Sequence, residues 1–256
     1  MIHPVYIVAL VLIIISIALI AFISKPKTLI SIVTIDRDAY LIPKVYQSIK
    51  HLLNKDHIDL LIVCRTTDIK TQDEWKKIDE NILLATINHY DIYKRHNLIG
   101  IRNQRNVAID VATKHNYDYL FFIDSDIIIQ NNTYDILLEG CRKYSDICLV
   151  PYMVRWTGYP AVCVSNGNNY NLQKVMSTND KNIEYLPCLA GGMGCTLIPR
   201  KIFTKINFKI LMAPIYIPDK QQLHKIRGED IGFFFSSYKK GYKSTYVQNH
   251  SVLHLN

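Results

Sequence analysis

The segment from Tyr119 to Ile129 places two carboxylates at the end of an apolar run, and it constrains the fold more than any other stretch. Large apolar and aromatic residues lead directly into Asp124 and Asp126, which predicts a buried β-strand with both acids at its carboxyl end. Two like charges beside a buried strand are costly unless a cation or several hydrogen-bond donors neutralise them. Ligands of open α/β sheets bind beyond the carboxyl ends of the strands, and Mg²⁺ or Mn²⁺ bridges carboxylates to phosphates. We therefore expect a metal–diphosphate site here, with a simple acidic turn after a core strand as the alternative.

The composition limits the class of protein. The chain has 256 residues, enough for one domain and a short appendage. Its formal net charge of +8 is consistent with an anionic substrate, a membrane surface or nucleic acid. No Lys/Arg-rich run and no nucleic-acid-binding motif is recognisable, so we expect no nucleic-acid partner. The six cysteines form no CxxC pair, which favours buried free thiols over a zinc site or a disulfide framework.

The N-terminal segment is strongly apolar. Residues 5–23 form an almost unbroken apolar run, which at about 1.5 Å per residue can just span a hydrocarbon core of roughly 30 Å. The run lacks a basic start and a convincing cleavage site, which favours a single-pass membrane anchor over a signal peptide. We therefore expect an anchor at residues 1–24 and a globular domain at residues 25–256. Lys25 and Lys27 weakly favour a cytoplasmic domain, and the side of the membrane stays open.

The remaining chain alternates strand and helix patterns in its first half. Strands are expected at residues 28–35, 58–64, 90–93 and 119–124, and helices at residues 41–53, 72–84, 103–114 and 133–143. This alternation predicts an α/β fold with a largely parallel sheet flanked by helices. The second half is less regular, with strands expected at residues 147–154 and 242–247, a loop or β-ribbon at residues 155–171 and a loop at residues 213–219.

Two further motifs lie in the second half. Three glycines between Gly191 and Gly194 allow the backbone to approach a ligand closely, although the Lys-Ser/Thr partner of a P-loop is missing. Glu229 and Asp230 open an apolar helical stretch. Acidic residues are favourable at a helix N-terminus, so capping alone would explain this pair.

Taken in order, these features resemble the GT-A glycosyltransferases, near their family 2-like members. The matching segments are Val33–Arg37, Arg102–Asn106, Phe122–Asp126, Gly191–Cys195, Gly228–Asp230 and a terminal His254. The resemblance covers roughly residues 28–256, and its specificity lies in the ordered set, not in any single motif. It implies a Rossmann-like mixed sheet that binds a UDP- or GDP-sugar donor and transfers the sugar to a hydroxyl group of a carbohydrate or glycoconjugate acceptor.

The resemblance also implies roles for individual residues. The implied donor-binding residues are Thr34, Asp36, Arg37, Asp68, Arg102, Arg105, Asn106 and Asp124. Asp124, Asp126 and His254 would hold Mn²⁺ or Mg²⁺, with His250 as a competing ligand. Gly191, Gly192 and Trp156 would shape the acceptor side.

Catalysis is implied for Asp230, with Glu229 beside it. Asp230 resembles the base of inverting members, which takes the proton of the acceptor hydroxyl as that oxygen attacks the anomeric carbon. The metal would stabilise the departing diphosphate as a Lewis acid. If the enzyme retains configuration instead, Asp230 would position a substrate, and the sequence does not decide between these outcomes.

Two other functions fit parts of the pattern. A phosphatase of the haloacid dehalogenase type also places Asp-x-Asp after an apolar strand, but Ile128 stands where that family usually has Thr or Val. A non-catalytic, membrane-anchored sugar-binding or scaffold protein on the same fold is the second alternative. The presence of both the Asp124 and the Asp230 motifs argues against it.

Overall fold

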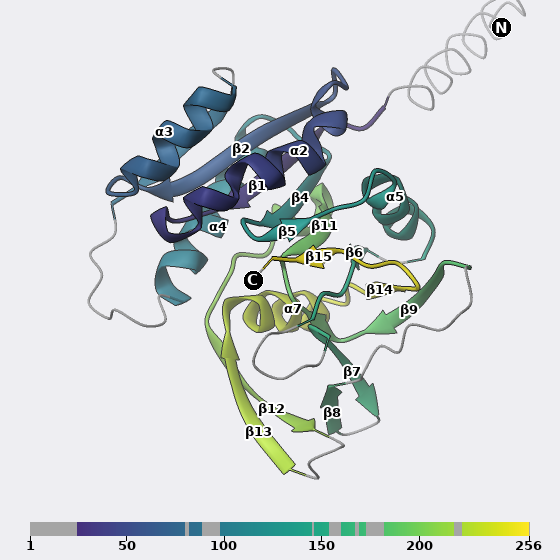
Figure 1. Ribbon diagram of the computed structural model, residues 1–256. Helices are drawn as coiled ribbons and strands as arrows, with labels where there is room; N and C mark the ends of the chain where they lie inside the picture. Colours follow the sequence, from purple (N-terminus) through teal and green to yellow (C-terminus); the bar gives the residue numbers. More distant parts are fainter. Residues whose placement is uncertain are drawn as a thin grey trace, which may run out of the picture.

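A computed structural model describes residues 25–79, 82–88, 98–144, 146–153, 160–166, 169–172, 182–217 and 222–255. Its centre is an eight-stranded sheet in the order β3-β2-β1-β4-β11-β6-β14-β9 (Figure 1). The strands are β1 (Thr28–Val33), β2 (Ile58–Arg65), β3 (Leu83–Ile87), β4 (Tyr119–Asp124), β6 (Ile147–Leu149), β9 (Glu184–Cys188), β11 (Cys195–Pro199) and β14 (Ser244–Gln248). Strands β1 to β4 are parallel, whereas β11 is antiparallel to both of its neighbours. This mixed sheet, flanked by helices, confirms the predicted α/β class.

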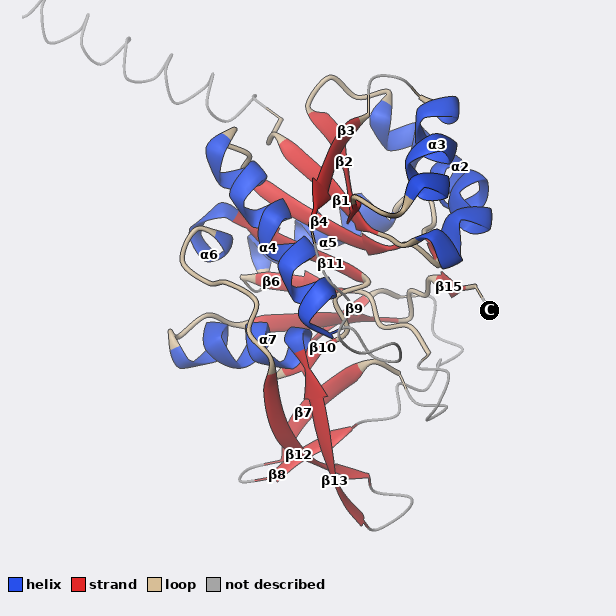
Figure 2. Cartoon of the chain, turned by 90° about the vertical axis from the view of Figure 1, so that its left-hand side faces the viewer, coloured by secondary structure: helices blue, strands red, loops and turns tan. Residues whose placement is uncertain are grey.

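Helices cover both faces of this sheet (Figure 2). One core lies beneath α4 (Leu98–Lys114), α6 (Arg200–Phe203) and α7 (Glu229–Lys239), and the other beneath α2 (Ile42–Leu53), α3 (Ile69–Ile78) and α5 (Thr133–Lys143). Strand β4 serves both cores because successive side chains point to opposite faces. Leu120 and Phe122 enter the first core, and Phe121 and Ile123 enter the second. The unbroken apolar run before Asp124 therefore reflects burial on both sides.

Two smaller sheets complete the fold. The five-stranded sheet contains β10 (Ala190–Gly191), β7 (Val162–Asn166), β8 (Asn169–Leu172), β12 (Leu211–Ile217) and β13 (Gln222–Gly228), in that order. Strand β5 (Ile127–Ile128) pairs with β15 (Leu253–His254), which returns the end of the chain to the Asp126 turn. A 3₁₀ helix, η1 (Asp36–Leu41), follows β1. The small sheets therefore bring late parts of the chain beside the carboxyl end of β4.

Several predicted boundaries are wrong. Residues 213–219 were expected to form a loop, but β12 spans Leu211–Ile217, with Ala213 and Ile215 buried. Pro214 is accommodated because β12 pairs along its length with β13 and meets β8 only at Tyr216. The helix expected at residues 72–84 ends at Ile78, and the strand expected at residues 147–154 ends at Leu149. The strand expected at residues 90–93 lies outside the described residues.

The predicted membrane localisation is corrected by this structure. Across the described ranges from residue 25 to residue 255, no helix has the length and apolar character needed to cross a bilayer. Residues 5–23, on which the predicted anchor rests, lie outside the described residues.

Candidate active site

The carboxyl ends of three neighbouring strands define the candidate site. In the sheet register Val33 of β1 lies beside Asp124 of β4 and beside Val63 of β2. The segments that follow these strands therefore emerge at the same edge of the sheet. This arrangement places Thr34, Asp36 and Asp124 at one edge of the sheet.

Arg105 is the centre of the charged network at this edge. Its side chain is buried, and its two terminal nitrogens donate to different carboxylates: Nη2 to Asp124 Oδ1 at 2.9 Å and Nη1 to Glu229 Oε1 at 2.7 Å. Burial lowers the pKa of Arg105, but the charges of Asp124 and Glu229 outweigh it and leave the pKa raised. The planar guanidinium thus joins α4, β4 and α7 in one arrangement.

Asp230 lies one residue beyond this network, in the first turn of α7. Gly228 is in extended conformation and ends β13, so the chain passes directly from the strand into the helix. Asp230 Oδ1 accepts a hydrogen bond from the Ile231 backbone N–H at 2.8 Å. Burial, together with the negative charge of Glu229, raises the pKa of Asp230 to about 7, although Arg105 opposes the shift. A carboxylate with such a pKa is suited to accept a proton near neutral pH.

Asp126 and His254 form a second polar pair on the other side of Asp124. His254 Nε2 lies 3.0 Å from Asp126 Oδ2, while Nδ1 lies 2.9 Å from the Met153 carbonyl. Burial and the charge of Asp124 raise the pKa of Asp126. The competing residue, His250, contacts the Thr133 hydroxyl instead. The structure therefore brings His254, and not His250, to Asp126.

The three expected metal ligands are not arranged as a preformed metal-binding site. Within the described residues, no group of three or more His, Cys, Asp or Glu side chains has the arrangement of a metal site. The Asp124 carboxylate already has a partner, because its Oδ1 accepts a hydrogen bond from Arg105. Its Oδ2 faces Gly194, where a Cβ would lie 2.5 Å from that oxygen, so the glycine is needed for the close approach.

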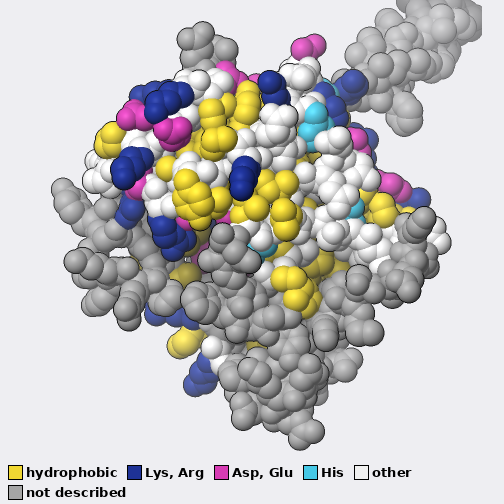
Figure 3. All heavy atoms as spheres, viewed as in Figure 1, with side chains coloured by type: hydrophobic (Ala, Val, Ile, Leu, Met, Phe, Trp, Pro, Cys, Tyr) yellow, Lys and Arg dark blue, Asp and Glu magenta, His cyan; other side chains and the backbone are white. Residues whose placement is uncertain are grey.

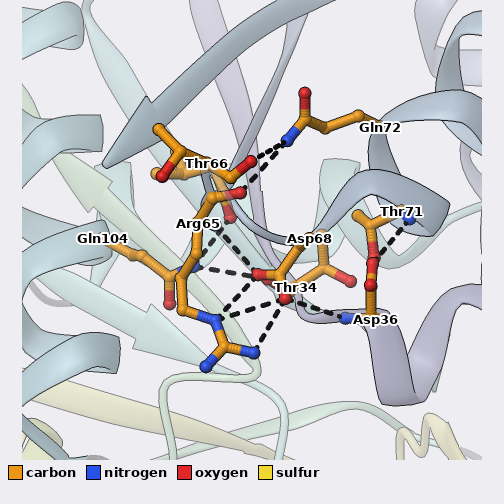
Figure 4. A network of polar contacts seen from close by, with 9 residues as sticks. Thr34, Asp36, Arg65, Thr66, Asp68, Thr71, Gln72 and Gln104 are labelled. Atoms are coloured by element: carbon orange, nitrogen blue, oxygen red, sulfur yellow. Dashed lines mark hydrogen bonds and ion pairs between the residues drawn. The ribbon is translucent and has the colours of Figure 1, made fainter. Parts of the chain in front are cut away.

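The first strand's end is tied to the second by a network around Asp68 (Figure 4). Asp68 is only 1% exposed. Its carboxylate accepts hydrogen bonds from the Arg65 guanidinium and from the Asp36 backbone N–H. Asp36 in turn accepts a hydrogen bond from the Thr71 backbone N–H at 2.9 Å. The Thr34 hydroxyl is buried, and none of the described residues bonds to it. Asp36 and Asp68 are thus held together at one edge of the site, and the buried Thr34 hydroxyl lies at the end of the same strand.

Other predicted donor-binding side chains have protein partners. Both amide atoms of Asn106 bond to the Phe208 backbone, and the Arg102 guanidinium donates to Asn103. Arg37 is largely exposed and pairs with Asp38. Asn106 therefore fastens α4 to the segment before β12, a role that its position in the sequence did not reveal.

Tyr152 is a site residue that the sequence analysis missed. Its hydroxyl lies 3.5 Å from Asp124 Oδ2, and its ring meets the His254 ring edge-on with centroids 5.4 Å apart. Burial, with the charges of Asp124 and Asp230, raises the pKa of Tyr152 well above its ordinary value. Of the expected acceptor residues, Gly192 is buried against this ring and Gly191 is buried against Leu149, whereas Trp156 lies outside the described residues. No sequence signal marks Tyr152, because its partners come from β4, the glycine segment and β15.

Comparison with known proteins supports the fold. No family model matches the chain, and no curated protein sequence matches it. Among solved structures, A197 from STIV is similar with a TM-score of 0.52 and 15% identity, over 90% of this chain and 86% of A197. Staphylococcus aureus TarS 1-349 is similar with a TM-score of 0.52 and 16% identity, over 90% of this chain and 60% of TarS 1-349. The same TarS fragment in complex with UDP is similar with a TM-score of 0.52 and 16% identity, over 88% of this chain and 59% of the fragment.

These similarities define a class of fold. The chain has a GT-A-like fold. At identities this low the likeness concerns the fold alone. The chain spans about 60% of TarS 1-349, so that protein's ligands do not pass directly to this one.

Proposed function

We propose that this protein is a metal-dependent glycosyltransferase that moves a sugar from a nucleotide-diphosphate sugar to a hydroxyl group of a carbohydrate or glycoconjugate. The observation that carries the proposal is the convergence of Asp124 and Asp230 on the buried Arg105, with Asp126 beside Asp124, at the carboxyl edge of a GT-A-like sheet. If Glu229 and Asp230 served only to cap the N-terminus of α7, neither a buried charged network nor a carboxylate of raised pKa would be needed.

The donor would bind across the edge formed by β1, β2 and β4. Thr34, Asp36 and Asp68 supply polar groups for the nucleoside, and Arg102 and the exposed Arg37 supply guanidinium groups for the diphosphate or sugar. TarS, which shares this fold, was solved in complex with UDP, and this supports a nucleotide-sugar donor.

A divalent cation fits the remaining groups. The raised pKa of Asp126 reflects burial beside a second carboxylate, and a cation there would offset that cost. Asp126 and His254 would hold Mn²⁺ or Mg²⁺ next to Asp124, with the Met153 carbonyl fixing the His254 ring from its other nitrogen. When bound, the metal supplies Lewis-acid stabilisation of the departing diphosphate.

Asp230 would act as the base of an inverting reaction. The acceptor hydroxyl gives its proton to the Asp230 carboxylate while its oxygen forms the new bond to the anomeric carbon. The bond between that carbon and the diphosphate oxygen breaks, and the nucleoside diphosphate leaves. Glu229 is 5% exposed and bound to Arg105, so its role is to position Arg105 and not to contact the acceptor.

The pH profile of transfer tests the assignment of the base. The pKa of Asp230 is raised to about 7, so the carboxylate is ionised above that pH and protonated below it. We expect kcat/KM for the acceptor to rise about ten-fold per pH unit below neutrality and to level off above it. The rate of nucleoside diphosphate release, measured with saturating donor, gives the profile. A flat profile between pH 5 and 8 with unchanged donor binding would exclude Asp230 as the base.

Replacing His254 with Ala tests the metal site. Because His254 Nε2 is the nitrogen that faces Asp126, its loss should raise the Mn²⁺ concentration needed for half-maximal donor binding at least about ten-fold. Titrating Mn²⁺ into protein with a fixed amount of donor measures the effect. His250→Ala is the matched control, since His250 contacts Thr133 and should leave the titration unchanged. Equal shifts in the two variants would remove His254 from the site.

A further inference from the structure

The positive charge of the chain is concentrated in one part of the sequence. Residues 200–243 contain ten Lys and Arg residues and three Asp and Glu residues, whereas the whole chain contains 30 and 22. The net charge of all the other residues together is therefore close to zero. A charge excess confined to 44 positions is informative only if the fold gathers those positions on one surface.

The fold does gather them. The described residues between 200 and 243 form α6, the segment before β12, the paired strands β12 and β13, and α7, which lie along one side of the molecule (Figure 2). Lys240 Nζ donates to the Lys205 carbonyl at 2.8 Å, and the Tyr242 hydroxyl donates to the Lys201 carbonyl at 3.1 Å. A Cβ on Gly232 would overlap the Lys209 carbonyl, so α7 is packed tightly against the segment that precedes β12. These contacts join the separate segments into one continuous surface.

The cations on this surface are exposed, and most of them form no ion pair with a described residue. We call it the basic strip, and its exposed residues are Lys201, Lys205, Lys209, Lys225, Arg227, Lys239, Lys240 and Lys243. Lys201 forms an ion pair with Asp146, and the other seven have no ion pair with any described residue. Glu229, an acid of this region, is buried against Arg105 and does not neutralise the strip.

At one end of the basic strip, exposed residues of β12 and β13 lie on one face of the paired strands. In the ladder between β12 and β13, Met212 lies opposite Arg227 and Pro214 lies opposite Lys225. All four residues are exposed, while Ala213 and Ile215 point to the core. Dark blue and yellow side chains lie at the lower left of Figure 3, over the region of β12 and β13 in Figure 1. Lys225 and Arg227 are two residues apart on one strand, so their backbone positions are separated by about 7 Å.

We propose that the basic strip binds an anionic carbohydrate chain, the acceptor of the proposed transferase, through acidic groups such as phosphate, sulfate or carboxylate. The cations are spread over several elements and do not converge on one point, so they suit an extended polyanion better than a single phosphate group. The strip also shares its elements with the proposed base, because β13 leads into α7 and Asp230 lies in the first turn of that helix. The assignment to the acceptor rests on the proposed function, but the binding itself can be measured without it.

Binding of the full chain to sulfated dextran and to neutral dextran tests the proposal. We expect salt-sensitive binding to sulfated dextran, because exposed charges are screened by salt, and none to neutral dextran. A variant combining Lys209→Ala, Lys225→Ala and Arg227→Ala should weaken that binding about 10- to 100-fold at low salt. The matched control combines Lys44→Ala, Lys50→Ala and Lys70→Ala, which removes the same charge from exposed positions on α2 and α3.

The outcomes separate the possible ligands. Equal weakening in both triple variants would show that net charge alone is responsible and would overturn the proposal. Tighter binding of a single-stranded oligonucleotide than of sulfated dextran, lost in the strip variant, would assign the strip to nucleic acid instead. Donor binding by the same proteins is measured in parallel. If neither the unaltered chain nor any variant binds a donor, the result would count against the proposed function and not against binding by the basic strip.

Discussion

Replacing Asp230 with Asn is expected to reduce sugar transfer roughly 10²- to 10⁴-fold while leaving donor binding unchanged. The amide cannot accept the acceptor proton, but it preserves the size of the side chain and its contact with the Ile231 N–H. Single-turnover transfer and calorimetric donor binding measure the two effects separately. Full transfer activity would remove Asp230 as the base, and an inactive unaltered chain that still binds donor would favour the non-catalytic alternative.

The same variant should be more stable than the unaltered protein at alkaline pH. The pKa of Asp230 is about 7 in the folded chain and near 3.8 without these neighbours. The folded state thus binds more protons between these values, and its stability falls as pH rises through that range. Asn removes this cost, so the free energy of unfolding at pH 8 should increase. Asp110→Asn, which removes one exposed carboxylate from α4, is the matched control and should change little.

Replacing Arg105 with Ala should destabilise the fold by roughly 3–5 kcal/mol, because two carboxylates would lose their common partner in a buried setting. This is a large share of the stability of a typical domain, about 5–15 kcal/mol. Denaturant unfolding gives the free energy. Arg102→Ala should cost less than about 1 kcal/mol, because Arg102 lies on the same helix and, among the described residues, bonds to its neighbour Asn103.

A second change keeps this prediction testable if the Arg105→Ala protein does not fold. Adding Glu229→Gln to Arg105→Met removes one buried acid together with the buried cation, and should recover part of the lost stability. Equal costs for Arg105→Ala and Arg102→Ala would show that the buried network does not hold α4, β4 and α7 together.

Local patterns predicted the elements that surround the site. The unbroken apolar run before Asp124 predicted β4, because a strand buried on both faces needs apolar residues at every position. The acidic pair after Gly228 predicted the start of α7, and five of the six cysteines are buried free thiols, as expected. Strand β12 was missed because Pro214 is typical of loops, and its tolerance depends on which neighbours the strand pairs with.

Contacts between residues far apart in the chain could not be predicted from the sequence. Arg105 was predicted to bind the donor, but its partner Glu229 lies 124 residues away, and only the packing of α7 against α4 brings the two together. Asn106 likewise meets the Phe208 backbone 102 residues away. Such contacts depend on how the elements pack, and a single sequence carries no local signal for them.

The central claim is that the carboxyl edge of the sheet binds a nucleotide-sugar with a divalent metal. The most direct test is calorimetry of the full chain with UDP-, GDP- and dTDP-sugars, in Mn²⁺ and in EDTA. Our account predicts that one donor class binds in Mn²⁺ and not in EDTA. The absence of binding to every donor, in protein shown to be folded by cooperative thermal unfolding, would contradict it.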